Sequence, residues 1–352
     1  MKHVFIEDIK SGMILGEDLL NNFNVTVFNK HHVVKDEDIE KIKKLDLLMI
    51  SIAEEKDLID KSENNDEAED SIIEAERQKY FDSFKDNYYD IINKYSSYAS
   101  NLDSSSKDAI EKTANDLISA LEKEKSFVEI IKLIRSEDFD VHRHCVNVSI
   151  ISFIIGKLLK MSNREKRNLV LTGLFHDVGF TCSAKDILGR PVIGVEDEPK
   201  HPFHSCEKVK SVYSFENEVI FGILNHHERI DGSGFPRGVK GNDINIYSRI
   251  LAVADEYDRM TTKSSKGENS PFSTLESLNK MSYGGGLDPK VVDVFTNMYT
   301  GNYLGHKVLL SDGRKGKIVY RNKYDKFRPM VKSGDEFIDL YSEYKLNIVD
   351  FI

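Results

Sequence analysis

Hydrophobic residues recur at helical spacing through the middle of the chain. Between residues 72 and 135, large apolar positions repeat every three or four residues and form two stripes. The stripes comprise Tyr80, Phe84, Tyr88, Ile91 and Ile92 on one predicted helix, and Ile110, Leu117 and Leu121 on the next. Such stripes normally pack in a core, and the alternative is a helical pair that forms a homodimer.

Short β-rich runs separated by turn residues predict strand-containing modules at both ends. In the N-terminal part we expect a short helix after Asp36 and strands at residues 4–6, 25–28 and 47–52. In the C-terminal part, from about Gly301, we expect strands at residues 308–310, 317–320 and 346–349. Turn residues join the latter runs, which predicts a small β barrel.

The expected fold is therefore multidomain α+β, with a central all-α domain between small β-rich modules at the N- and C-termini. The predicted segments are a small α+β module at 1–53, an acidic linker at 54–76, a helical region at 77–135, a helical domain at 136–300 and a β-barrel-like module at 301–352. Eleven acidic residues against two lysines between Glu54 and Glu76 predict a solvated linker or the start of a helix rather than a core.

Composition narrows the classes of function. The formal net charge is −10, from 49 basic and 59 acidic residues, which argues against DNA or RNA as a partner. The three cysteines lack metal-type spacing and no signal peptide is visible, so we expect a reduced, cytoplasmic chain. The most apolar segment, residues 145–161, is shorter than the ~20 residues that span a bilayer, which predicts a buried helix and no membrane span.

Seven histidine and aspartate residues are candidate metal ligands. His176 and Asp177 stand together at the end of an apolar helix, which a capping box at Ser162 and Glu165 should start. A single histidine on such a helix is usually a hydrogen-bonded core residue. The full set nevertheless falls within 112 residues and includes two adjacent pairs: His144, His176, Asp177, His201, His226, His227 and Asp255.

These residue types suit a two-metal centre. A carboxylate can bridge two cations, and imidazoles can bind them from both sides. Two cations ~3.5–4 Å apart generate hydroxide at neutral pH and hold the attacking and leaving oxygens of a phosphodiester. Mixed nitrogen and oxygen ligands favour iron or manganese over zinc. After the histidine doublet, Gly232 and Gly234 lie in a loop that allows close approach to a ligand.

The order of these motifs resembles the HD-GYP subgroup of the HD superfamily. The chain has His-Asp-x-Gly at His176, His-Pro at His201, His-His-Glu-Arg-x-Asp-Gly-x-Gly-Phe-Pro from His226 and Arg-Ile-Leu-Ala-Val-Ala-Asp-x-Tyr-Asp from Arg249. The resemblance covers about residues 136–300 and implies an HD-type helical domain. It also implies hydrolysis of cyclic di-GMP, or a related cyclic dinucleotide, to pGpG or GMP by a hydroxide that bridges the metal ions. Diguanylate cyclase-type signalling proteins would be partners.

The same resemblance implies roles for individual residues. One metal ion would be held by His144, His176, Asp177 and Asp255, and a second, bridged by Asp177, by His201, His226 and His227. Asp177 and His176 would be catalytic. Asp140 stands where some members have a glutamate that binds a third ion, so we expect two or three divalent ions, iron or manganese. The substrate contacts would be Arg229, Asp231, Gly232, Gly234, Phe235 and Pro236.

Two departures from the family pattern remove cations aimed at substrate phosphate. Phe180 stands where the family usually has lysine, and residues 262–267 replace an arginine-rich run. Such losses cost ~2–4 kcal/mol each in the transition state, and Lys185, Lys263 or Lys266 are candidates to replace the lost charge. A phosphodiesterase with reduced activity and a catalytically inactive relative that senses cyclic dinucleotides or binds proteins both stay open. Hydrolysis of another nucleotide is a third hypothesis, which the Gly-Phe-Pro run and the histidine doublet disfavour.

Overall fold

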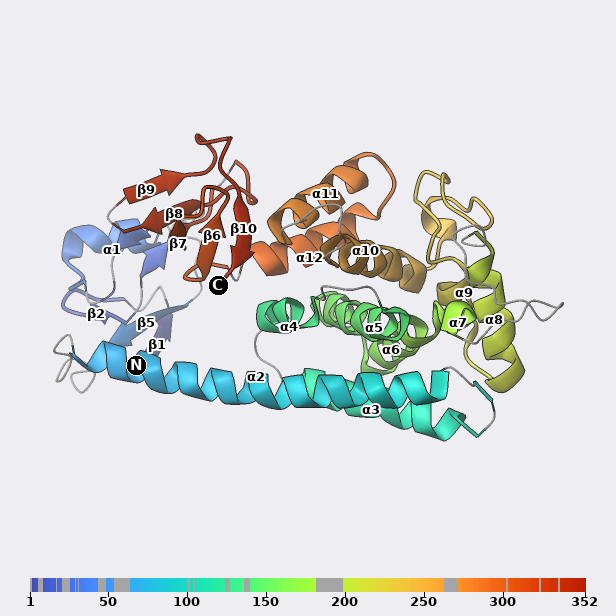
Figure 1. Cartoon of the computed structure of the whole chain (residues 1–352). Coiled ribbons are helices and arrows are strands. Elements are labelled where there is room, and N and C mark those ends of the chain that lie inside the picture. Colours follow the sequence, from blue (N-terminus) through green and yellow to red (C-terminus); the bar gives the residue numbers. More distant parts are fainter. Residues whose placement is uncertain are drawn as a thin grey trace. The chain divides into compact units, whose positions relative to one another are not determined.

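The computed structural model divides the chain into two compact units, Met1–Lys79 and Tyr80–Ile352. The structure describes residues 2–5, 9–16, 18–20, 26–28, 30, 32–43, 49–53, 64–99, 102–103, 105–123, 127–135, 140–181, 199–262, 271–301, 303–322, 324–334 and 336–352. The expected multidomain α+β fold is confirmed, with helices in the middle of the chain and strands towards both ends (Figure 1).

The first unit contains a small antiparallel sheet and one short helix. Strand β5 (Met49–Ala53) pairs with β1 (Lys2–Phe5) on one side and β2 (Ile14–Leu15) on the other. Strands β3 (Leu19–Leu20) and β4 (Thr26–Phe28) form a separate pair, and α1 (Asp36–Lys43) begins at Asp36, the residue that was expected to precede it as its cap. A small core includes Leu15, Ile42 and Ile50. Strands β2 and β3 were not predicted, because two residues are too few to show an alternating pattern.

Helix α2 (Asn64–Ala99) is 36 residues long and begins in the first unit and ends in the second. It starts inside the stretch that the sequence assigned to an acidic linker. Acidic residues are favourable at the start of a helix, because its N-terminus carries partial positive charge. The alternative interpretation of this stretch, as the start of a helix, therefore applies from Asn64 onward. The apolar stripe expected on this helix is buried at Phe84, Tyr88 and Ile91.

The remaining helices build the middle of the second unit. In chain order they are α3 (Lys107–Lys123), α4 (Phe127–Ile134), α5 (Val141–Leu158), α6 (Asn163–Phe175), α7 (Val178–Thr181), α8 (His201–Val212), α9 (Asn217–Leu224), the 3-10 helix η4 (Gly241–Asp243), α10 (Ile246–Thr261), α11 (Pro271–Tyr283) and α12 (Pro289–Gly301). Helix α5 packs against α6 and α10, and α9 also packs against α6 and α10 (Figure 1). The predicted all-α centre is confirmed.

Helix α5 lies at the centre of this packing. Every residue from His144 to Gly156 is buried, as expected of a helix that is apolar on all sides. Helix α6 starts at the predicted capping box, in which the Glu165 carboxylate accepts from the backbone N–H of Ser162 at 2.8 Å. Among the described residues, no helix combines the length and the apolar character needed to cross a membrane.

Five antiparallel strands follow the helices. They are β6 (Lys307–Leu310), β7 (Lys315–Tyr320), β8 (Met330–Ser333), β9 (Glu336–Asp339) and β10 (Ile348–Phe351), in the order β10-β6-β7-β8-β9. Strands β8 and β9 were not predicted, and no pairing in the described part of the chain joins β9 to β10. The module is therefore an open sheet where a barrel was expected.

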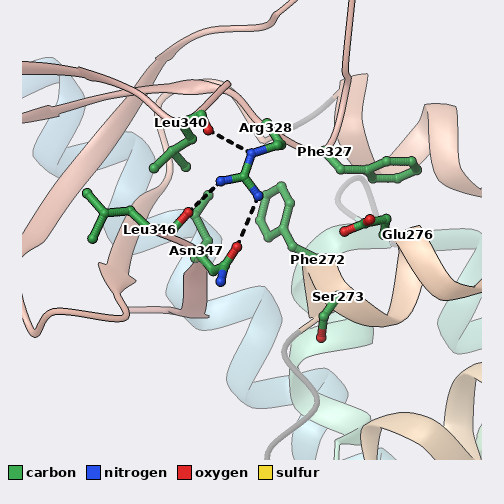
Figure 2. A pocket seen from close by; sticks show the side chains of 9 residues that line it. Phe272, Ser273, Glu276, Phe327, Arg328, Leu340, Leu346 and Asn347 are labelled. Atoms are coloured by element: carbon green, nitrogen blue, oxygen red, sulfur yellow. Dashed lines mark hydrogen bonds between the residues drawn. The ribbon is translucent and has the colours of Figure 1, made fainter. Parts of the chain in front are cut away.

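A small pocket lies where this sheet meets α11 within the second unit (Figure 2). Arg328 forms one wall, and its guanidinium donates to Leu340 O at 2.7 Å, Leu346 O at 2.7 Å and the Asn347 side chain at 3.0 Å. Its donors are thus used to hold the chain between β9 and β10. Phe272 from α11 lines the same pocket and packs on Phe351 of β10.

Candidate metal centre

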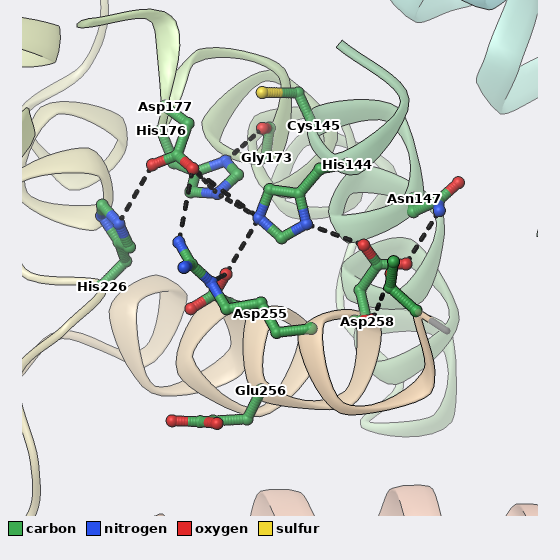
Figure 3. Close-up of polar contacts among 12 residues, drawn as sticks. His144, Cys145, Asn147, Gly173, His176, Asp177, His226, Asp255, Glu256 and Asp258 are labelled. Atoms are coloured by element: carbon green, nitrogen blue, oxygen red, sulfur yellow. Dashed lines mark hydrogen bonds and ion pairs between the residues drawn. The ribbon is translucent and has the colours of Figure 1, made fainter. Parts of the chain in front are cut away.

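Three of the predicted ligands meet in one buried group. His144 on α5, His176 just after α6 and Asp255 on α10 place one ligand atom each within 4.8 Å of one another. His144 Nε2 lies 3.0 Å from Asp255 Oδ1 and 3.3 Å from His176 Nε2 (Figure 3). All three side chains are at most 2% exposed. This group is called the first ligand group.

The other four predicted ligands form a second group. Asp177, His201, His226 and His227 also place one ligand atom each within 4.8 Å of one another, and all are buried. His201 begins α8, and the histidine doublet follows α9. His201 Nε2 lies 3.2 Å from His226 Nε2. This set is called the second ligand group.

The Asp177 carboxylate joins the two groups, because its oxygens point in different directions. Oδ2 lies 3.7 Å from His144 Nε2 and 3.5 Å from His176 Nε2, in the first group. Oδ1 lies 3.1 Å from His201 Nε2 and 3.6 Å from His226 Nε2, in the second group. This is the arrangement that a bridging carboxylate requires. The ligand roles themselves stay a prediction.

The hydrogen bonds of the histidine rings show which nitrogens are available as ligands. His176 Nδ1 lies 2.7 Å from Gly173 O, and His226 Nδ1 lies 2.6 Å from Ile223 O. A carbonyl oxygen only accepts, so Nδ1 carries the hydrogen and Nε2 presents a lone pair to the centre. The lone pair of His226 therefore faces the carboxylate of Asp177, and these groups repel unless a cation lies between them.

Buried polar atoms without hydrogen bonds support the same conclusion. Within the described residues, Asp177 Oδ1, Asp255 Oδ2 and His227 Nε2 are buried and make no well-formed hydrogen bond. Such atoms normally carry a penalty of about 1–3 kcal/mol each, more when charged. Divalent cations held by the two ligand groups would satisfy these atoms, so the residues present fit a metal centre.

The protonation states of His176, His227 and Asp255 suit metal binding, whereas that of His144 opposes it. Burial lowers the pKa of His176 to about 3 and holds the pKa of His227 well below its usual value, so both rings are neutral near pH 7. Burial raises the pKa of Asp255, but Arg259, His144 and His227 together lower it well below its usual value and keep that carboxyl ionised. Burial also lowers the pKa of His144, but the carboxylates of Asp255 and Asp258 prevail and raise it to about 10. A metal ion must therefore displace a proton from His144.

Two residues beside the ligands were not assigned roles from the sequence. Asp258 Oδ2 accepts from His144 Nδ1 at 2.7 Å, which directs His144 Nε2 into the centre (Figure 3). Arg259 donates to Asp255 Oδ1 at 2.7 Å, and a second guanidinium nitrogen lies 3.5 Å from Asp177 Oδ2. Both follow Asp255 by three or four residues on α10, so helical periodicity could have placed them on the same face.

The glycine loop lies next to the second ligand group. Phe235 stacks on His227 with ring centroids 4.6 Å apart, and its N–H donates to His227 O. Gly234 has no room for a side chain, because an added Cβ would lie 2.4 Å from His227 O and from Arg229 N. Gly232 has a positive φ of 81°, which favours glycine. Pro236 follows Phe235 through a cis peptide bond.

The other predicted substrate contacts are engaged within the protein. Arg229 donates to Glu256 at 2.7 Å, and the exposed Asp231 carboxylate accepts from Ser233 Oγ at 2.7 Å. Asp140, the candidate third-metal ligand, caps α5 by accepting from Arg143 N at 2.8 Å, and its side chain is exposed. It belongs to neither ligand group. Lys185, Lys263 and Lys266 lie outside the described residues.

Phe180 stands at the sequence position where the family resemblance implies a lysine. Its ring stacks on His201 with centroids 4.4 Å apart and planes 30° apart. The ring thus covers a ligand of the second group with an apolar surface. It supplies no charge for a substrate phosphate.

Comparison with known proteins points to one family. Residues 129–291 match the HD domain family. A cyclic di-GMP phosphodiesterase of Pseudomonas aeruginosa is 27% identical over 231 residues, which cover 62% of this chain and 55% of that protein. A 3'3'-cGAMP-specific phosphodiesterase of Vibrio cholerae is 32% identical, over 43% of this chain and 36% of that protein. A cyclic di-GMP phosphodiesterase of Thermotoga maritima is 30% identical, over 54% of this chain and 53% of that protein. The chain spans about half the length of these relatives, or less.

Proposed function

We propose that this chain belongs to the HD-GYP group of the HD domain family and that it is a metal-dependent phosphodiesterase, which hydrolyses cyclic di-GMP to pGpG or GMP. The observation that carries the proposal is the orientation of Asp177, whose two carboxylate oxygens face two separate ligand groups. Two of the three relatives described above are cyclic di-GMP phosphodiesterases. Iron or manganese is the proposed metal, since the ligands are nitrogen and oxygen atoms only.

The protein's own contribution is to hold the ligands and orient the substrate. When bound, divalent cations neutralise phosphate charge and lower the pKa of water. Asp177 would fix the separation of the two ions, and Asp258 would keep His144 in the tautomer that presents Nε2. Phe235, packed on His227, would form a wall of the site beside the second group. The Asp177 and His176 pair would thus act through the metals, with no separate general base.

The test is a comparison of substrates with metal-loaded protein. We expect the protein loaded with Mn²⁺ or Fe²⁺ to convert cyclic di-GMP to a linear product, which chromatography separates from the substrate. A chelator-treated sample serves as the control and should be inactive. Parallel incubation with 3'3'-cGAMP tests substrate choice, because one relative is specific for it. If metal-loaded protein leaves both cyclic dinucleotides intact, the proposed phosphodiesterase activity is refuted.

Arg259 is the proposed phosphate contact that offsets the missing lysine. It is about one third exposed and lies beside both Asp255 and Asp177. We expect Arg259→Ala to lower kcat/KM about tenfold, because a charged hydrogen bond to the phosphate is lost, and Arg259→Lys to retain part of it. Arg249→Ala is the matched control, because Arg249 lies near the start of the same helix but forms its ion pair with Asp288. Equal kcat/KM in Arg259→Ala and wild type would remove Arg259 from the proposal.

A second candidate function is a cyclic-dinucleotide sensor or protein-interaction module with little or no catalysis. The stacking of Phe180 on His201 favours it, because an apolar ring replaces a charged contact. Calorimetry with metal-loaded protein separates the two. Tight binding of cyclic di-GMP without a linear product would establish the sensor, and Phe180→Lys would then be expected to introduce or raise turnover.

A further inference from the structure

A buried chain of hydrogen bonds connects helix α2 to the first ligand group. The Tyr88 hydroxyl on α2 donates to Asn147 Oδ1 at 2.7 Å, and Asn147 Nδ2 donates to Asp258 Oδ1 at 2.8 Å. The other oxygen of Asp258 accepts from His144 Nδ1 at 2.7 Å. All four residues are at most 3% exposed. Three helices, α2, α5 and α10, therefore contribute to the position of one candidate ligand.

The direction of every hydrogen bond in this chain is fixed by its partners. Asn147 Nδ2 also lies 3.0 Å from Ile134 O, so the amide nitrogen faces two groups that can only accept. The amide oxygen must then face Tyr88, which must donate. Burial raises the pKa of Tyr88 well above its usual value, so the hydroxyl stays protonated. The amide cannot turn over without losing bonds at both ends.

We propose that Tyr88 is a positioning residue for His144, acting through Asn147 and Asp258, so that helix α2 sets how tightly the first ligand group retains its metal ion. The inference rests on the metal centre of the proposed function. Without the Tyr88 hydroxyl, Asn147 Oδ1 is buried with no donor, and the amide keeps only the hydrogen bonds of its nitrogen to Ile134 O and Asp258. The donor to Asp258 is then held less firmly, and so is the His144 ring that Asp258 positions.

The test measures metal release, with no substrate present. Full-length protein loaded with Mn²⁺ is mixed with excess chelator, and the release phases are recorded. His144→Ala identifies the phase that belongs to the first ligand group, because it removes a ligand there. We expect Tyr88→Phe to accelerate that phase about three- to tenfold and leave the other phase unchanged. Asp258→Ala removes the hydrogen bond to His144 itself and should accelerate it about ten- to a hundredfold.

Two variants of α2 serve as matched controls. Tyr89→Phe removes the same hydroxyl from the next residue, whose side chain is 45% exposed, and should change neither phase. Ile91→Val shortens a buried side chain on the same helix and lowers the midpoint of thermal unfolding without touching the hydrogen-bond chain. It should also leave both phases unchanged. General loosening of α2 is thereby separated from loss of the Tyr88 hydroxyl.

A double variant tests whether Tyr88 acts through Asp258. If it does, Tyr88→Phe adds no further acceleration to Asp258→Ala, because the connection is already broken. Unchanged release in Tyr88→Phe, equal acceleration of both phases, or full additivity with Asp258→Ala would each overturn the inference. Protein that releases Mn²⁺ in two phases but hydrolyses no cyclic dinucleotide would refute the proposed phosphodiesterase activity. The role of Tyr88 in metal retention could still be tested by the same measurement.

Discussion

The Asp177→Ala variant is expected to lose cyclic dinucleotide hydrolysis by at least about a thousandfold and to retain less than the full complement of metal. The reason is geometric: one oxygen of this carboxylate lies 3.1 Å from His201 Nε2 and the other 3.5 Å from His176 Nε2, so a single side chain serves both ligand groups. Metal content after gel filtration and the rate of linear product formation are the two measurements.

The midpoint of thermal unfolding distinguishes a loss of metal and activity in Asp177→Ala from misfolding of the variant. Asp177 is buried and Oδ1 makes no well-formed hydrogen bond, although His176, His201 and His226 hold the pKa of the carboxyl well below its usual value. Burial and this attraction oppose each other, so metal-free Asp177→Ala should unfold close to the temperature of metal-free wild type, while added Mn²⁺ should raise the midpoint more in the wild type than in the variant. Asp288→Ala is the control, since it breaks an ion pair with Arg249 outside the centre and should keep metal and activity. Full metal content and full activity in Asp177→Ala would contradict the two-metal arrangement.

The candidate ligand residues could be picked out from the sequence because their chemistry is local. His176 with Asp177, and His226 with His227, are adjacent pairs, and each pair follows the end of an apolar helix. Their division into two groups was implied by resemblance to a family and could not be derived from spacing. The structure brings together the side chains that this division requires.

Contacts between distant segments could not be predicted in this way. Tyr88 precedes Asn147 by 59 residues, and its place in an apolar stripe indicated only that it would be buried. Asp258 and Arg259 could have been predicted from the sequence as neighbours of the site, because they share a helix face with Asp255. Strands β8 and β9 were missed because their pattern is short and interrupted by turns. The start of α2 was obscured by acidic composition, which suits both a linker and the first turns of a helix.

Gly173→Ala is expected to destabilise the protein by about 3 kcal/mol, at the upper end of the range for overpacking. A Cβ at this position would lie 2.7 Å from Ser149 Cα and 2.8 Å from Ser149 N, so it meets the backbone of α5 where no side chain can move aside. Helices α5 and α6 would have to separate. Since α5 carries His144, and Gly173 O accepts from His176 Nδ1, we expect metal affinity to fall as well. Denaturant unfolding and Mn²⁺ titration measure the two effects.

Two other glycines in helices show whether the close helix contact is the cause. At Gly301 an added Cβ meets nothing within 4 Å, so Gly301→Ala should be neutral or slightly stabilising. At Gly156 the close neighbour is Leu169 Cδ1 at 2.6 Å, the end of a flexible side chain, so Gly156→Ala should have an intermediate cost. The expected order of stability is Gly301→Ala, then Gly156→Ala, then Gly173→Ala. A Gly173→Ala variant as stable as Gly301→Ala would show that α5 and α6 can move apart freely, and the spacing between His144 and His176 would then need another cause.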